Sequence, residues 1–145
     1  MNVKIREMIE SDRNVVLQMM ETFYSSDAVA TNGSAEIFKS DVDACVSDNP
    51  FLEGYIFELE GKSIGYSMLA KSFSTEYGKP CIWIEDIYLL DEFRGGGIAG
   101  LFFSFIEEKY PGHLFRLEVE KENERAIRAY EKGGFDFLPY LEMKK

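Results

Sequence analysis

The chain has 145 residues, 46% of them hydrophobic and 14% aromatic, which is enough for one folded domain and excludes a disordered chain. Its net charge of −10, from 16 Lys and Arg against 26 Asp and Glu, excludes the basic surface that nucleic-acid binding needs. No segment approaches the roughly 20 apolar residues of a membrane span. Two cysteines and one histidine cannot complete a zinc site. We therefore expect a single cytoplasmic domain, residues 1–145, with no metal, nucleic-acid or membrane partner.

The N-terminal part of the chain is predicted to form one strand and two helices. Val3–Arg6 is a short strand. A helix follows from about Asp12 to Tyr24, because apolar residues recur on one of its faces. A second helix ends at about Val46, where Asp48-Asn49-Pro50 stops it.

Three strands are predicted next. Phe51–Glu60 and Ser63–Phe73 are joined across Gly61-Lys62, a two-residue connection that suits a tight hairpin. The chain then turns into the strand Cys81–Leu90, which we expect to lie antiparallel to the hairpin.

The C-terminal part alternates helices and strands. A helix is predicted over about Gly97–Tyr110, then the strand Leu114–Val119, then the helix Glu124–Lys132 with Asn123 as its N-cap, and finally the strand Phe135–Met143. The element order is βααβββαβαβ. It predicts an α/β (mixed α+β) fold, in which a mixed central sheet carries helices on both faces.

A glycine-rich turn joins the strand that ends at Leu90 to the helix that follows it. Such a turn leaves several backbone N–H groups unpaired, and the positive end of the helix dipole lies behind them. Together they form a site suited to phosphate. The residues of this turn and helix start are Arg94, Gly95, Gly96, Gly97, Ile98, Ala99 and Gly100.

The same turn satisfies the pattern G-x-G-x-x-G, with Glu118 and Glu120 about 20 residues further on, as in a dinucleotide-binding domain. That domain needs parallel βαβ units around the motif, whereas predicted hairpins precede it here and only 45 residues follow Gly100. A P-loop is excluded because no Gly-Lys-Ser/Thr closes the turn. A dinucleotide site and a purely structural turn are thus two of the possible interpretations of this segment.

Two linked motifs resemble the GNAT superfamily of acetyl-CoA-dependent N-acetyltransferases. The first is Arg-x-x-Gly-x-Ala, formed by Arg94, Gly97 and Ala99, and the second continues through Asn123 to Tyr130 and the Gly134-Phe135 pair. The matching blocks span about residues 82–137. Ala99 stands where glycine is commoner, and Gly96 where a lysine or glutamine is frequent, so one phosphate contact is lost while the backbone seat is kept.

The resemblance implies acetyl-CoA as cosubstrate. Its pantetheine arm would lie between two splayed parallel strands, Ile82–Leu90 and Leu114–Val119. The residues that the resemblance implies for cofactor binding are Ile87, Tyr88 and Leu89 on the strand, Arg94 to Gly100 for the pyrophosphate, and Asn123 and Tyr130 on the last helix. Asn123 suits a plain N-cap, a cofactor contact, or both.

The chemistry is direct attack of an amine on the thioester, for which a general base is useful. An amine of pKa about 10.4 costs about 4.6 kcal/mol to deprotonate at pH 7. Glu85 and Asp86 are adjacent on a strand and are expected to face opposite ways. The block around them resembles the polyamine (diamine) acetyltransferase branch, which favours Glu85 as the base through water. Asp86 and a purely structural role for both acids are the alternatives.

Tyr130 matches the tyrosine that often protonates the leaving thiolate in this superfamily. A phenol of pKa about 10 can donate a proton to a thiolate whose conjugate acid has a pKa near 8.5. The competing interpretation places Tyr130 in the core, on the same helical face as Ala126 and Ile127.

The acceptor is less constrained. A small cationic amine, such as a polyamine, an amino acid or an aminoglycoside, is favoured over a peptide N-terminus or a lysine side chain. A non-catalytic acyl-CoA sensor is the alternative to an enzyme. Dimerisation is common in the superfamily, so the resemblance allows a homodimer. Side chains that could line the acceptor site are Phe23, Tyr24, Asp27, Glu36, Phe73, Glu76, Tyr77 and Tyr140.

Overall fold

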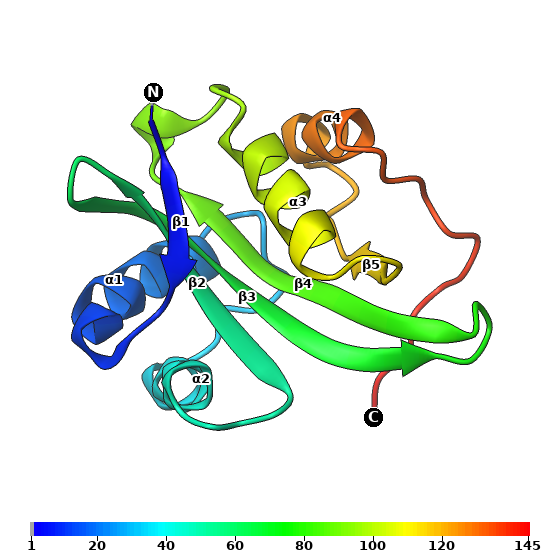
Figure 1. The fold of residues 1–145 in the computed structure, drawn as a ribbon, viewed down its shortest axis with the longest axis horizontal. Coiled ribbons are helices and arrows are strands. Elements are labelled where there is room, and N and C mark those ends of the chain that lie inside the picture. Colours follow the sequence, from blue (N-terminus) through cyan, green and yellow to red (C-terminus); the bar gives the residue numbers. More distant parts are fainter. Residues whose placement is uncertain (1) are drawn as a thin grey trace.

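The computed structural model describes residues 2–145 and shows one five-stranded sheet whose strands follow each other in chain order (Figure 1). The first four strands are antiparallel neighbours, and the fifth lies parallel to the fourth. This mixed sheet confirms the predicted fold class. The strands are β1 (Lys4–Glu7), β2 (Leu52–Leu59), β3 (Lys62–Ser74), β4 (Lys79–Leu89) and β5 (Leu114–Leu117).

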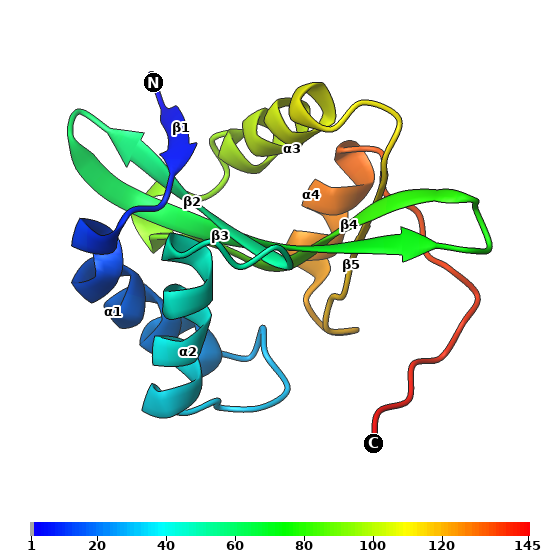
Figure 2. The ribbon, with the colours of Figure 1, turned by 60° about the horizontal axis from the view of Figure 1, so that its bottom comes forward.

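Helices cover both faces of the sheet, as the sequence predicts (Figure 2). α1 (Arg13–Tyr24) and α2 (Ala35–Val46) lie on one face, and α3 (Ile98–Lys109) and α4 (Glu124–Lys132) on the other. Two 3-10 turns, η1 (Glu10–Asp12) and η2 (Asp91–Phe93), precede α1 and α3. Among residues 2–145 no helix is both long and apolar enough to cross a membrane.

Each face has its own hydrophobic core. The α1/α2 core contains Val16, Met20 and Val42, all fully buried against Ile56 and Tyr66 of the sheet. The α3 core, on the other face, is built from Phe102, Phe103 and Ile106 of α3 packed on buried side chains of β2, β3 and β4, with Tyr130 of α4 at its margin. The predicted apolar face of α1 is buried, whereas Ile37 of α2 and Leu101 of α3, which the same periodicity would bury, are 52% and 46% exposed.

The β2–β3 hairpin turns one residue earlier than predicted. Leu59 pairs with Lys62, so Glu60 and Gly61 form the two-residue turn rather than Gly61 and Lys62. Both turn residues have positive φ, 50° and 78°, as a type I′ turn requires. The prediction was wrong because glycine suits the second position of such a turn as well as the first. With Gly61 in the second position, Glu60 occupies the first and adopts the left-handed conformation.

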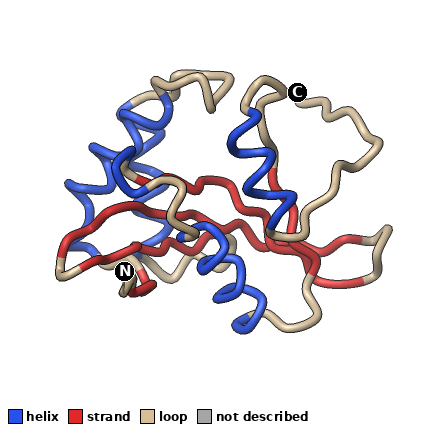
Figure 3. Tube along the Cα trace, turned by 90° about the horizontal axis from the view of Figure 1, so that it is seen from above, coloured by secondary structure: helices blue, strands red, loops and turns tan. Residues whose placement is uncertain are grey.

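The predicted last strand, Phe135–Met143, is wrong. The chain beyond α4 is loop throughout and swings away from the sheet (Figure 3). β5 offers an edge of only four residues, and Pro139 lacks the N–H that a paired strand would donate. Only Phe135, the first apolar residue of this tail, packs against the α3 core, and Leu141 and Met143 are both 97% accessible to solvent.

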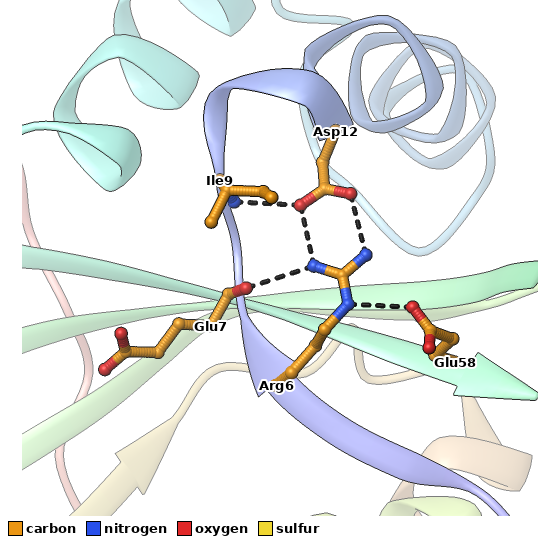
Figure 4. Close-up of polar contacts among 5 residues, drawn as sticks. All are labelled: Arg6, Glu7, Ile9, Asp12 and Glu58. Carbon is orange, nitrogen blue, oxygen red and sulfur yellow. Dashed lines mark hydrogen bonds and ion pairs between the residues drawn. The ribbon is translucent and has the colours of Figure 1, made fainter. Parts of the chain in front are cut away.

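An arginine-centred network ties the N-terminal strand to the start of α1 (Figure 4). The Arg6 guanidinium donates two hydrogen bonds of 2.9 Å to the Asp12 carboxylate and one of 2.8 Å to Glu58 on β2. Asp12 also accepts from the Ile9 amide at 2.8 Å. These bonds hold the pKa of Asp12 below its usual range, chiefly through Arg6.

Candidate active site

The parallel pair formed by β4 and β5 opens part-way along its length. Pairing runs only from Cys81 opposite Leu114 to Ile84 opposite Leu117. β4 continues to Leu89, whereas β5 ends at Leu117, so the last part of β4 has no strand beside it on that edge. The predicted pantetheine-binding residues Ile87, Tyr88 and Leu89 lie on this unpaired segment, and their contact with pantetheine stays a prediction.

A β-bulge lies at the mouth of this opening. On β3, Met68 pairs with Asp86, and the next residue, Leu69, pairs with Ile84. Glu85 is therefore an extra residue on β4 without a partner on β3. A bulge re-aims the side chains around it and shifts the alternation that follows.

The bulge directs Glu85 and Asp86 to the same face of the sheet. Ile84 and Ile87 both pack in the α3 core although three positions separate them, so the two residues between them belong to the opposite face. Asp86 there meets Tyr24 of α1. The expectation that the two acids face opposite ways is wrong for this reason. The sequence does indicate the bulge, because the alternation of apolar residues along the strand changes phase between Ile84 and Ile87.

Asp86 is buried and fully engaged by the protein. The residue is 4% exposed to solvent. Its carboxylate accepts hydrogen bonds from the hydroxyls of Tyr24 at 2.8 Å and Tyr66 at 2.7 Å. Burial raises the pKa of Asp86, and the two phenol bonds oppose that rise. The Ser67 hydroxyl donates to the Asp86 carbonyl oxygen at 2.7 Å and fixes the backbone beside the bulge.

Glu85, by contrast, is exposed, and its carboxylate makes no hydrogen bond within residues 2–145. Its pKa is raised by partial desolvation and by the charges of Asp86 and Glu142. The same negative charges act on two further acids. Burial, Asp86 and Glu85 raise the pKa of Asp41 on α2 to about 6, and Glu142, burial and Glu85 raise that of Glu118 to about 7. Glu85 is thus electrostatically coupled to four further carboxyl groups, those of Asp41, Asp86, Glu118 and Glu142.

Asp41, Glu118 and Glu142 were not assigned to this acidic group from the sequence. They come from α2, from the segment after β5 and from the C-terminal tail, and only the tertiary fold brings them near Glu85. Of the predicted acceptor-site residues, Tyr24 reaches Asp86, while Tyr140 of the tail hydrogen-bonds to Glu76. Phe73 and Tyr77, on and beside the β3–β4 hairpin, are exposed.

The glycine turn has the conformation that an anion site requires. Gly95 and Gly97 have φ of 80° and 83°, a left-handed conformation that side chains disfavour. Within residues 2–145 the amides of Gly95, Gly96 and Gly97 donate to no other group, and no side chain caps α3. No atom lies within 4 Å of the Cβ position of Gly97 or Gly100, which leaves space in front of the turn. These residues fit a pyrophosphate, with Ile98 and Ala99 opening α3 behind them.

Arg94 positions this turn through its side chain. Its Nε donates to the Leu89 carbonyl oxygen at 2.9 Å, its guanidinium pairs with Asp91 at 2.7 Å, and it stacks on the Tyr88 ring at 5.4 Å. The side chain thereby ties the glycine turn to the end of β4.

α4 contributes Asn123 and Tyr130. The Asn123 side chain accepts a hydrogen bond from the Ala126 amide at 3.3 Å, which confirms the predicted N-cap. Tyr130 packs edge-on against Phe103 and Phe135 with ring centroids 6.1 and 6.2 Å away, and burial raises the pKa of its phenol. Its hydroxyl has no hydrogen-bond partner among the described residues. The core interpretation of its ring and a catalytic role of its hydroxyl are therefore compatible.

A cavity of about 820 Å³ extends around the free edge of β5. Tyr130 lines it from the α4 side, Trp83 and Arg116 line it from the strands, and Glu118 lines it from the segment after β5. Glu118 and Glu142 also line this cavity, whereas Glu85, Asp86 and Asp41 do not, and within residues 2–145 no hydrogen bond links Tyr130 to Glu85. Among the described residues, no group of three or more His, Cys, Asp or Glu side chains is arranged to hold a metal ion.

The chain is similar to known acetyltransferases in sequence. It is 26% identical to the thialysine N-epsilon-acetyltransferase of Mus musculus over 154 aligned positions, which cover 97% of this chain and 88% of the relative.

Solved structures share the fold. A possible acetyltransferase from Clostridium difficile 630 superposes with a TM-score of 0.81 at 20% identity, covering 99% of this chain and 96% of the other. An aminoglycoside N-acetyltransferase in complex with CoA gives 0.80 at 14% identity, with 99% and 94% covered. The family model described as acetyltransferase (GNAT) family matches residues 17–135, most of the domain described above. The chain therefore belongs to the GNAT acetyltransferase family.

Proposed function

We propose that the protein is an acetyl-CoA-dependent N-acetyltransferase for a small cationic amine. Family membership supports acetyl transfer to an amine as the reaction. The observation that carries the proposal is the opening between β4 and β5. The unpaired amides of the glycine turn follow the end of β4, and Glu85, on the bulge where the pairing of β4 with β5 ends, is electrostatically coupled to four further carboxyl groups.

The glycine turn and β4 would hold acetyl-CoA. Gly95, Gly96 and Gly97 offer free amides to the pyrophosphate, and the unpaired edge at Ile87–Leu89 offers backbone groups to the pantetheine arm. When bound, this cosubstrate supplies the acetyl group as a thioester. The turn and the strand edge orient it toward the bulge.

Glu85 acts as the general base in this proposal. It is the accessible acid of the pair, and its raised pKa makes it a better proton acceptor than an ordinary glutamate. It takes the proton of the substrate ammonium at its carboxylate, directly or through water. Asp86, whose oxygens accept from two phenols, positions the bulge and adds negative charge.

Tyr130 acts as the proton donor. Its raised pKa keeps the phenol protonated at neutral pH, and its hydroxyl has no competing partner within residues 2–145. It donates the hydroxyl proton to the departing thiolate sulfur.

The charge around the site supports a cationic acceptor. Carboxylates from three parts of the chain gather at Glu85, and an acidic surface attracts cations. The names of the similar proteins specify thialysine and an aminoglycoside, both of which carry amines. Polyamines, amino acids and aminoglycosides are therefore the first acceptors to test.

Thermal unfolding with acetyl-CoA, CoA or NAD tests the cosubstrate. A ligand at 100 times its Kd stabilises the native state by about 2.7 kcal/mol. We expect stabilisation by acetyl-CoA and CoA but not by NAD, and stabilisation by NAD alone would contradict the proposal. Release of free CoA thiol with a panel of amines then separates an enzyme from an acyl-CoA sensor, which would bind without turnover.

A further inference from the structure

Ser67 is a buried serine at a position of β3 where an apolar side chain would be expected. Its chain neighbours Tyr66 and Met68 pack in the α1/α2 core, so the Ser67 side chain points to the opposite face, that of α3. Leu69, two residues further on, belongs to the α3 core. Ser67 is 0% exposed to solvent. A buried hydroxyl costs free energy unless it is hydrogen-bonded, so a serine at this position needs a specific acceptor.

The acceptor of the Ser67 hydroxyl lies directly beside the β-bulge. It is the backbone carbonyl oxygen of Asp86, 2.7 Å away on β4. Asp86 pairs with Met68 on β3, and Glu85, the residue before it, is the extra residue of the bulge. A bulge disrupts the ladder of backbone hydrogen bonds locally. The bond from Ser67 adds a restraint on the backbone at this point.

Asp86 is thereby held from both faces of the sheet. On the α1/α2 face its carboxylate accepts hydrogen bonds from the hydroxyls of Tyr24 and Tyr66. From the α3 face the Ser67 hydroxyl holds its carbonyl oxygen. These bonds fix the orientation of Asp86, and one planar peptide group joins it to Glu85. Without the bulge, the regular alternation of a strand would put Glu85 and Asp86 on opposite faces.

We propose that Ser67 is a positioning residue for the general base. It holds the bulge in the form that directs Glu85 to the α1/α2 face. This inference rests on the proposed function, in which Glu85 accepts the proton of the substrate ammonium. The Glu85 carboxylate makes no hydrogen bond within residues 2–145, so its direction depends on the backbone that carries it. A base must lie about 3 Å from the proton that it removes, and a misplacement of about 1 Å can cost about 100-fold in rate.

The test uses Ser67→Ala, with Ser72→Ala as the matched control. Ser72 lies on the same strand, and its hydroxyl donates to the carbonyl oxygen of Cys81, its partner in a regular part of the ladder, at 3.4 Å. Ser67→Ala should lower kcat at least about tenfold and change the Kd for acetyl-CoA less than about twofold, because the glycine turn is unaltered. Ser67→Cys, with a weaker donor, should fall between Ser67→Ala and the wild type. Ser72→Ala should match the wild type.

A double-mutant cycle with Glu85→Gln separates positioning from a general structural effect. Because Ser67 acts through the Glu85 carboxylate, Ser67→Ala should lower kcat less than about twofold in the Glu85→Gln background, where the base is already absent. The cycle uses Ser67→Cys if Ser67→Ala does not fold.

Equal losses in both backgrounds would overturn the inference and leave the proposed function intact, and so would wild-type turnover in Ser67→Ala. A Glu85→Gln variant with wild-type turnover would overturn the role of Glu85 as the base, and the inference with it.

Discussion

Glu85 and Asp86 occupy neighbouring positions on β4 but have different surroundings. Asp86 is buried between two tyrosine hydroxyls, whereas Glu85 is exposed on the bulge with no hydrogen-bond partner in the described chain. Replacing Asp86 would leave two phenols without their acceptor, so loss of activity in such a variant would be difficult to separate from a structural change. Glu85 is the residue whose substitution isolates the chemistry.

Glu85→Gln should lower kcat/KM about 100-fold at pH 7, the lower end of what a general base contributes. The loss should shrink as the pH approaches 10, because an increasing share of the amine is then already deprotonated. The pH dependence of kcat/KM for the variant and the wild type measures this. Glu21→Gln, at an exposed position on α1, is the control and should follow the wild type. A defect of constant size at every pH would exclude a proton-accepting role.

Tyr130→Phe removes one hydroxyl and keeps the ring that packs on Phe103 and Phe135. Because the hydroxyl has no partner within residues 2–145, the variant should unfold within about 1 kcal/mol of the wild type. The Kd for acetyl-CoA should be unchanged. The kcat should fall about 100-fold, the lower end of what one general acid contributes, because the thiolate loses its proton donor. Calorimetry gives the Kd and steady-state kinetics give kcat. Full acetyl-CoA binding with unchanged turnover would restrict Tyr130 to the core.

At the scale of elements, the predicted helices match the structure closely. The ends of a helix can be read from the sequence, because both its apolar stripe and its capping residues stop there. α4 was predicted over Glu124–Lys132 and forms over that range, capped by Asn123. Strands were less predictable, since their limits depend on neighbours. β5 stops at Leu117, two residues short of the prediction, where its pairing with Ile84 ends. The acid pair was found in the sequence, but its orientation depends on the bulge.

The glycine turn before α3 allows a prediction with an internal control. Gly97 and Gly112 have similar left-handed φ, 83° and 76°, and no atom lies within 4 Å of either Cβ position. Gly97→Ala and Gly112→Ala should therefore both destabilise the fold by about 1 kcal/mol, the cost of a left-handed alanine. Only Gly97→Ala should raise the Kd for CoA, because only Gly97 belongs to the turn that is proposed to bind the pyrophosphate. Denaturant unfolding measures the loss of stability and calorimetry measures the Kd. Equal CoA affinity in both variants would contradict the assignment of the pyrophosphate site to the glycine turn.

For the whole molecule, the sequence predicted the mixed sheet and the helical layer on each of its faces. It also predicted the order of the elements along the chain, except for the C-terminal strand. The prediction of that strand was wrong because a period-2 pattern shows only that a segment can pair. It does not show that the edge of another strand is available as a partner. The acidic group shows the same limit. Asp41, Glu85 and Glu142 lie far apart in the chain, and only the packing of α2 and the path of the tail bring their charges to one place.

This concentration of acids sets the pH dependence of stability. The folded-state pKa values of Asp41, about 6, and Glu118, about 7, lie above those of the unfolded chain, near 4. Between those values the folded protein binds more protons than the unfolded one, so the free energy of unfolding falls as the pH rises. Asp12, paired with Arg6, has a lowered pKa, so the stability that it contributes is lost only as the pH falls below about 4.

Thermal unfolding should therefore give a Tm that is higher at pH 5.5 than at pH 7.5 and falls again below about pH 4. Asp41→Asn should stabilise the protein at pH 7.5 by about 1 kcal/mol, less than the pKa alone implies, because solvent screens this half-buried acid. It should also flatten the slope between pH 5.5 and 7.5, whereas Asp27→Asn, in the α1–α2 loop, should keep it. A wild-type Tm that is constant or rising from pH 5.5 to 7.5 would contradict the raised pKa values of Asp41 and Glu118 in the folded state.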